Sequence, residues 1–98
     1  MKGLDLVSLV DGELCVDGNM TFATVNKLWE QSRPLLQRVS AITVNLTGAT
    51  NCDSAGLALL IEWKRLAEKD KKSIQFKNTP DQLLKIAEIS GLSGFFFT

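Results

Sequence analysis

The sequence predicts a single α/β domain over residues 1–98: a small mixed four-stranded sheet with helices packed mainly on one face, in the order β-β-α-β-α-β-α. Three observations predict this fold. The 98 residues are enough for one hydrophobic core and too few for two. Short β-rich runs alternate with segments of helical periodicity, which is typical of β-α-β units. The pair Asp11-Gly12 separates the first two β-rich runs, which indicates a hairpin.

The N-terminal part of the chain is predicted to form the hairpin and the first helix. Residues 4–9 and 13–17 lie on either side of the turn and are expected to be strands. Thr21 is expected to cap a helix that begins near Phe22 and continues with apolar residues at helical spacing. Pro34 lies inside this pattern and is expected to kink or end the helix.

The remaining strands follow from two further β-rich runs. Residues 41–46 are predicted to be a central strand, because both of its faces carry apolar or small side chains. Residues 47–51 are expected to form the loop at its C-terminal end, where α/β sheets carry functional groups. Residues 73–77 are the last expected strand, and the pair Thr79-Pro80 predicts the start of a final helix.

The helix predicted over residues 54–69 is the centre of the functional interpretation. Asp53 precedes it and is a suitable N-cap, because its carboxylate can accept the free backbone N–H groups at the helix start. Ser54 then falls in the first turn, near the positive end of the helix dipole. One face of the helix is expected to point to the core and collects Gly56, Leu59, Leu60, Trp63, Leu66 and Ala67.

The opposite face of this helix is the candidate partner-binding surface. It collects Ser54, Leu57, Ala58, Ile61, Arg65 and Glu68. Its C-terminal half is charged, as a solvated face should be, but its N-terminal half surrounds one hydroxyl with apolar side chains. An apolar patch away from the core indicates a partner surface. The alternative is that a neighbouring loop or helix of the same domain covers Leu57 and Ile61, and the pattern alone leaves both interpretations open.

Composition argues against several classes of function. Eleven basic and eleven acidic residues cancel, so no overall charge attracts nucleic acid or an anionic membrane. No apolar run approaches the roughly 20 residues that span a bilayer, and no secretory signal is apparent. We therefore expect a cytoplasmic protein without direct membrane insertion. Histidine is absent, the two cysteines are isolated and no Walker pattern occurs, so we expect neither a metal site nor a cofactor.

An enzyme that uses Ser54 as its nucleophile, with Asp53 as partner, is not expected. A serine nucleophile needs a base, usually histidine or lysine, and the chain has no histidine and no lysine in this motif. A nucleophile elbow also requires glycine two residues before the serine, where this chain has Cys52.

Two features are left open by the sequence. Cys52 is either a buried thiol or a regulatory one, because a helix start lowers the pKa of a nearby thiol. The three phenylalanines Phe95, Phe96 and Phe97 are expected to fold back onto the domain, and the alternative is that they join a partner or a second copy.

The order of elements, joined to Asn51-Cys52-Asp53-Ser54-Ala55-Gly56-Leu57-Ala58-Leu59-Leu60, resembles the STAS domain family. That family includes bacterial anti-sigma-factor antagonists and the cytoplasmic parts of sulfate transporters. Its signature is an aspartate, a serine or threonine, a small residue and then Gly-Leu at the start of a helix. The likeness covers essentially the whole chain, and it implies that Ser54 takes the family's key hydroxyl position and Asp53 the acidic position before it.

Two branches of the family compete. The antagonist branch usually carries two adjacent hydroxyl residues before the Gly-Leu, whereas this chain has Ala55 at the second position. The chain is more similar to the MlaB-like branch, the small STAS subunit of bacterial Mla-type phospholipid ABC transporters, in its lone hydroxyl, its length and the run Leu28-Trp29-Glu30. This resemblance implies a non-enzymatic interaction module that binds the cytoplasmic ATPase subunit at the inner face of the inner membrane. The alternative is an anti-sigma-factor antagonist, whose partner is an anti-sigma-factor serine kinase that phosphorylates Ser54.

Both branches imply the same contact surface. Leu57, Ala58 and Ile61 are expected to supply apolar contact, with Ser54 adding a hydrogen bond beside Asp53 and Arg65 forming a charge at the rim. A phosphate on the serine adds nearly two negative charges. A helix N-terminus tolerates that charge, but a partner's apolar surface does not. We therefore expect phosphorylation to abolish binding without unfolding the domain.

Overall fold

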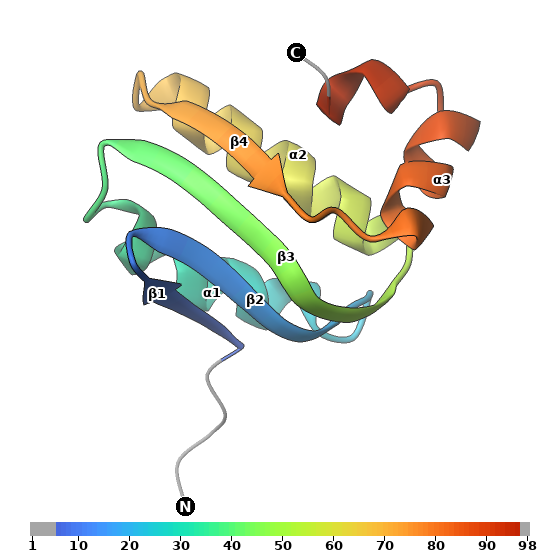
Figure 1. Ribbon diagram of the computed structural model, residues 1–98, viewed down its shortest axis with the longest axis horizontal. Helices are drawn as coiled ribbons and strands as arrows, with labels where there is room; N and C mark the ends of the chain where they lie inside the picture. The colour runs from blue at the N-terminus through green and yellow to red at the C-terminus, as the bar shows by residue number, and fades with distance from the viewer. Residues whose placement is uncertain (1–5, 97–98) are drawn as a thin grey trace, which may run out of the picture.

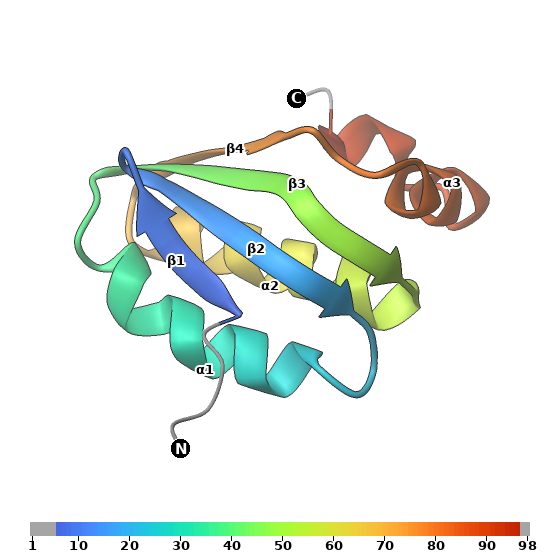
Figure 2. The same ribbon diagram turned by 60° about the horizontal axis from the view of Figure 1, so that its bottom comes forward.

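The computed structural model describes residues 6–96, and it shows one sheet with the strand order β1-β2-β3-β4 and two helices across one face (Figures 1 and 2). The strands are β1 Val7–Val10, β2 Glu13–Met20, β3 Ala41–Cys52 and β4 Ser73–Lys77. The helices are α1 Val25–Leu36, α2 Ser54–Lys69 and α3 Asp81–Ile89, followed by the short 3₁₀ helix η1 Ser93–Phe96. The predicted fold class and order of elements are confirmed. The expectation that Phe95, Phe96 and Phe97 fold back concerns side chains that lie outside the described part of the structure.

The predicted hairpin is present between β1 and β2, which pair antiparallel. Asp11 and Gly12 both have positive φ, at 52° and 79°, as the two central residues of a tight hairpin turn require. The pairs β2–β3 and β3–β4 are parallel, so α1 and α2 are the crossover helices that return the chain across the sheet.

The core lies between the sheet and the pair α1 and α2, as Figure 2 shows from the side. Trp63 is fully buried at its centre, and its indole N–H donates a 2.8 Å hydrogen bond to the hydroxyl oxygen of Ser32. That hydroxyl donates in turn to the carbonyl oxygen of Trp29, at 2.9 Å. The polar groups that the two helices bury are therefore paired with one another, which fixes how α1 and α2 pack.

The first helix differs from the prediction at both ends. It begins at Val25, because the preceding residues form a turn in which the Thr24 hydroxyl accepts from the backbone N–H of Thr21 at 3.0 Å. The predicted start at Phe22 is therefore wrong, and this phenylalanine is 85% exposed instead of joining the core stripe. The helix also continues two residues beyond Pro34, to Leu36, so of the two expected effects of the proline, a kink or an end, the end does not occur.

The two central strands are longer than predicted. Parallel pairing between β2 and β3 continues to the pair Met20 and Cys52, with irregular register on the way. Residues 47–51 are thus part of β3 and not a loop, so the central strand leads directly to Asp53 and α2. Gly48 permits this close pairing, because a Cβ atom at its position would lie 2.5 Å from the carbonyl oxygen of Val16.

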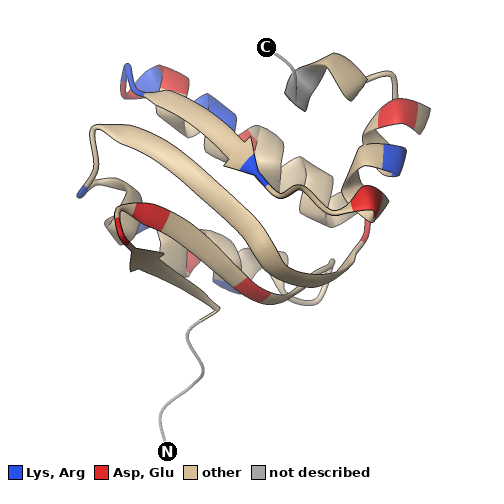
Figure 3. Cartoon of the chain, viewed as in Figure 1, with Lys and Arg blue, Asp and Glu red and all other residues tan. Residues whose placement is uncertain are grey.

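The other face of the sheet is not covered by α1 or α2 and carries polar side chains. Glu13 on β2 accepts hydrogen bonds from Asn45 on β3, at 3.2 Å, and from Lys77 on β4, at 2.8 Å. The hydrogen bond from the lysine is the main cause that lowers the pKa of Glu13. Figure 3 looks onto this face and shows acidic residues on β2 and a basic residue at the end of β4. None of the helices in the described residues is long and apolar enough to cross a bilayer.

Candidate interaction surface at the start of α2

Asp53 fixes both the start of α2 and the loop that precedes α1. Its Oδ1 atom accepts from the backbone N–H groups of Ala55, at 2.8 Å, and Gly56, at 3.4 Å. Its Oδ2 atom accepts from the backbone N–H of Phe22, at 3.1 Å. These bonds, the one from Phe22 first, lower the pKa of the carboxyl group. The predicted N-cap is confirmed, and the same carboxylate also joins two segments that are far apart in the sequence.

Gly56 allows the start of α2 to lie against the end of β2. A Cβ atom at this position would be 2.6 Å from the carbonyl oxygen of Met20 and 3.5 Å from a methyl carbon of Leu83. Any side chain here would push the helix away from the strand. The glycine of the Asp-Ser-Ala-Gly-Leu run therefore sets how close the helix start comes to the sheet.

Ser54 is the first residue of α2 and is exposed. Its hydroxyl has no hydrogen-bond partner within residues 6–96, whereas the carboxylate of the preceding residue is fully engaged. A side chain that is accessible on a rigidly capped helix start can meet a protein partner or accept a modification. The structure thus exposes the serine that the sequence placed on the candidate surface, and its role in binding stays a prediction.

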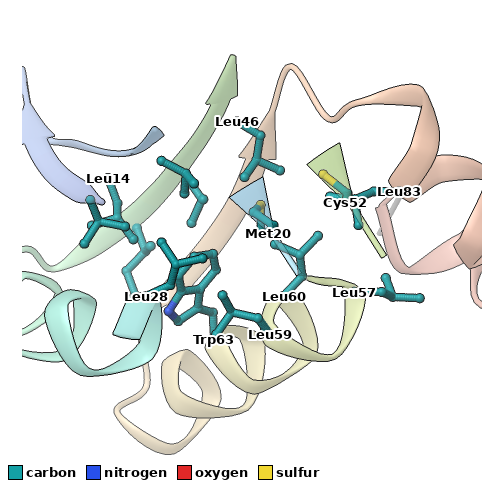
Figure 4. Packing of buried hydrophobic residues seen from close by; sticks show 14 of the residues in the cluster. Leu14, Met20, Leu28, Leu46, Cys52, Leu57, Leu59, Leu60, Trp63 and Leu83 are labelled. Atoms are coloured by element: carbon teal, nitrogen blue, oxygen red, sulfur yellow. The ribbon is translucent and has the colours of Figure 1, made fainter. Parts of the chain in front are cut away.

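Leu57 was expected on the exposed face, and this expectation is wrong. Its side chain is only 4% exposed and belongs to the hydrophobic core. The third helix packs against this side of α2, and Figure 4 shows Leu57 at the end of the core that also holds Cys52 and Leu83. The alternative that a neighbouring helix covers this position therefore holds for Leu57. Ile61, one turn further along α2, is partly buried at the margin of the same core.

The side of α2 that faces α1 carries a groove, which the helical pattern did not predict. Ala58 and Arg65 are exposed, as expected. Beside them, between the two helices, lies a largely apolar groove of about 290 Å³, lined by Val25, Asn26, Trp29, Ala55, Ala58, Leu59 and Glu62. The apolar spacing of the first predicted helix gave no indication of the part of this surface that α1 contributes, where Trp29 is only partly buried.

Arg65 forms an ion pair with Glu62, 3.3 Å apart, on the surface of α2. The two side chains are 72% and 52% exposed, so the pair contributes little to stability because solvent screens it. A partner can therefore attract the guanidinium without first breaking a strong bond.

Cys52 is a structural thiol in this arrangement. It is buried, and burial is the main cause that raises its pKa, with the charge of Asp53 acting in the same direction. The pKa of this thiol is thus shifted in the direction opposite to the lowering that a helix start would cause. Within residues 6–96, no group of three or more histidine, cysteine, aspartate or glutamate residues is placed to hold a metal ion.

Comparison with known proteins identifies the chain's relatives. A family model described as "Mlab, STAS domain" matches residues 8–97. The intermembrane phospholipid transport system binding protein MlaB of Haemophilus influenzae is 30% identical over 80 residues, which cover 78% of this chain and 76% of that protein.

Two solved structures share the fold. The anti-sigma factor antagonist SpoIIAA in its unphosphorylated form superposes with a TM-score of 0.62 and 19% identity, covering 85% of this chain and 80% of that one. A sulfate transporter family protein from Wolinella succinogenes superposes with a TM-score of 0.62 and 15% identity, covering 84% and 67% respectively. At these identities the two structures support the fold alone.

Proposed function

Because the chain belongs to the STAS domain family, we propose that it is the small STAS subunit of an Mla-type phospholipid ABC transporter and that it binds the cytoplasmic ATPase subunit of that transporter. The similarity to a protein named as part of an intermembrane phospholipid transport system supports this assignment. On this proposal the chain acts at the cytoplasmic face of the inner membrane, which it reaches through its partner.

The observation that carries the proposal is the exposed Ser54 hydroxyl, held on a capped helix start. The proposed contact surface keeps four of the predicted residues, which are Ser54, Ala58, Ile61 and Arg65. Asp53 holds the helix start in place and does not itself contact the partner in this proposal, because its carboxylate already accepts from three backbone N–H groups. Leu57 is left out because it is buried.

We assign the surface to binding and not to catalysis. The chain contains no histidine, and no side chain within residues 6–96 bonds to the Ser54 hydroxyl to serve as its base. Nucleotide hydrolysis belongs to the ATPase partner in this proposal, so the chain itself needs no cofactor.

Affinity purification from the native cell tests the proposal. The tagged wild-type chain should recover an ABC ATPase, identified by mass spectrometry. Ser54→Asp and Ile61→Glu should each lose most of it, because one places a charge at the centre of the contact and the other in its apolar margin. Ser40→Asp is the matched control, since it adds the same charge at an exposed serine before the opposite end of β3. Thermal unfolding of all variants separates lost binding from lost folding. Recovery of the ATPase by both surface variants contradicts the proposed site.

A second function is favoured by the same accessible hydroxyl. If the chain is an anti-sigma-factor antagonist, incubation with an anti-sigma-factor serine kinase and ATP should place a phosphate on Ser54, and Ser54→Ala should accept none. Phosphate transfer together with failure to recover an ABC ATPase would replace the first function by the second.

A further inference from the structure

A continuous groove follows the line where α1 meets α2. The first hollow, of about 290 Å³, is the one described above. A second hollow, of about 250 Å³, is lined by Trp29, Arg33, Glu62, Arg65, Leu66 and Lys69. The two share Trp29 and Glu62, so they adjoin along the helices. We call the pair the seam groove.

The chemistry of the seam groove changes along its length. Near the start of α2 its walls are apolar and its floor is open, because the helix presents the small side chains Ala55 and Ala58 there. Towards the end of α2 three cations, Arg33, Arg65 and Lys69, line it with Glu62 as the one acidic residue. This end of the groove therefore has an excess of positive charge.

Two of the three cations are not committed to carboxylates. Arg65 pairs with Glu62, but Arg33 and Lys69 form no ion pair within residues 6–96. The Arg33 guanidinium instead lies 5.5 Å from the centre of the Trp29 ring. Tryptophan and arginine are among the residue types enriched at the positions that contribute most to the energy of protein interfaces.

The dimensions and charges of the groove indicate its occupant. From Ala55 to Lys69 the groove follows roughly 20 Å of α2, at about 1.5 Å per residue, which matches a partner helix of about four turns. The chain has no net charge, and the acidic Glu62 lies among the cations of the groove. Both observations argue against a membrane or nucleic-acid surface of closely spaced phosphates as the occupant. An amphipathic protein segment meets both halves, since its apolar side chains fit the open hollow and its carboxylates complement the cations.

We propose that the seam groove receives an amphipathic, acidic segment of the ATPase partner, with apolar side chains beside Val25 and Ala58 and carboxylates against Arg33, Arg65 and Lys69. The proposal rests on the proposed function, because it assigns the occupant to that partner. It extends the contact from the Ser54 hydroxyl along the α1 side of α2, the side opposite to the one that α3 covers.

Charge reversal tests the cationic half. The double variant Arg33→Glu, Lys69→Glu should weaken binding of the purified ATPase roughly tenfold, because two attractive contacts become repulsive. The matched control is Arg38→Glu, Lys85→Glu, which makes the same change at exposed cations outside the groove and should alter the dissociation constant less than about twofold. Equal loss in both double variants, or loss in neither, overturns the proposal.

Photo-crosslinking tests the apolar half. A photoreactive amino acid at Asn26, which is exposed and lines the groove, should capture an ATPase peptide that carries apolar and acidic side chains. The same amino acid at Lys85 on α3 is the control and should capture none. If the photoreactive amino acid captures the ATPase when placed at Ser54 but not when placed at Asn26, the inference is overturned while the proposed function stays intact.

Failure of the proposed function is recognised separately, as absence of ATPase binding by the wild-type chain. In that case a probe peptide tests the groove without the ATPase. Binding of a helical peptide with leucines on one face and glutamates beside them is compared with binding of the same peptide carrying lysines in place of the glutamates. The groove is supported if the glutamate peptide shifts the NMR signals of the Val25 and Ala58 amides and binds with a dissociation constant at least about tenfold lower than that of the lysine peptide. Equal binding overturns it. Binding to phosphatidylglycerol vesicles that depends on Arg33 and Lys69 also overturns it, in favour of a membrane.

Discussion

The two sides of α2 near its start are covered differently. Towards α3, Leu57 is 4% exposed and packs in the same core as the fully buried Leu83. Towards α1, Ala58 is exposed beside an open groove. Both residues lie in an apolar run around one serine, yet one stabilises the domain and the other is available to a partner. Apolar character alone therefore does not mark a contact surface, because a third helix that arrives from elsewhere in the chain can close one side.

The largest expected difference between the two sides concerns stability. Leu57→Ala should lower the free energy of unfolding by about 2–4 kcal/mol, because it leaves a cavity in the core. Ala58→Ser on the open side removes no core contact. Beyond the small difference in helix propensity between the two residues, it should change the free energy of unfolding by less than about 0.5 kcal/mol. Chemical denaturation of both variants measures the two values. Similar costs at both positions would mean that the closed and open sides do not differ as described.

Gly56 sharpens the comparison, because it lies on the sheet side of the helix. Gly56→Ala should destabilise the domain by about 1–3 kcal/mol, even though alanine favours a helix, because the new methyl group meets the carbonyl oxygen of Met20. Gly94→Ala is the control, since among the described atoms, apart from the glycine and its two chain neighbours, none lies within 4 Å of the added carbon. Denaturation midpoints measure both effects. A stabilised Gly56→Ala would show that α2 shifts freely from β2.

Asp53 should make stability depend on acid. Its carboxyl pKa is lowered in the folded chain, so its ionised form stabilises the fold above the unfolded pKa, and this contribution is lost as the pH falls through the folded pKa. Asp53→Ala should lower the free energy of unfolding near pH 7, because the cap is lost. Between neutral pH and roughly pH 3, Asp53→Asn should lose less stability than the wild type, because the amide does not titrate. Acid denaturation of both proteins measures the difference, and an equal loss of stability with falling pH in the wild type and in Asp53→Asn would contradict this role.

The smallest expected effect on stability is at Ser54. Ser54→Asp should change the free energy of unfolding by less than about 0.5 kcal/mol, since the side chain is exposed and the helix start tolerates a negative charge. Thermal unfolding measures it, beside the binding test described above. A large loss of stability would mean that the hydroxyl supports the fold and is not held for a partner.

Local patterns were sufficient for the parts of the fold that depend on near neighbours. The Asp11-Gly12 hairpin, the Asp53 cap and the burial of Leu59 and Trp63 were predicted because turn conformation, capping and helical spacing are set within a few residues. The order of elements then indicated the parallel pairs of the mixed sheet.

The errors arose where distant segments meet. Burial of Leu57 depends on where α3 returns after β4, which its own helical position does not encode. The extension of β3 through residues 47–51 depends on pairing with β2 and outweighs the turn character of that stretch. Phe22 is exposed because its backbone N–H donates to the Asp53 carboxylate and a further hydrogen bond to the Thr24 hydroxyl holds its loop in place, whereas apolar spacing alone predicted burial.

The divided use of the Asp53 carboxylate links two events that would otherwise be independent. One of its oxygens holds the amide of Phe22 and the other holds the amides of Ala55 and Gly56. Displacement of the loop before α1 by a bound molecule would release one oxygen and change the restraint on the first turn of α2. Hydrogen exchange at Ala55 and Gly56 would then report, through a single side chain, on an encounter that takes place at Phe22.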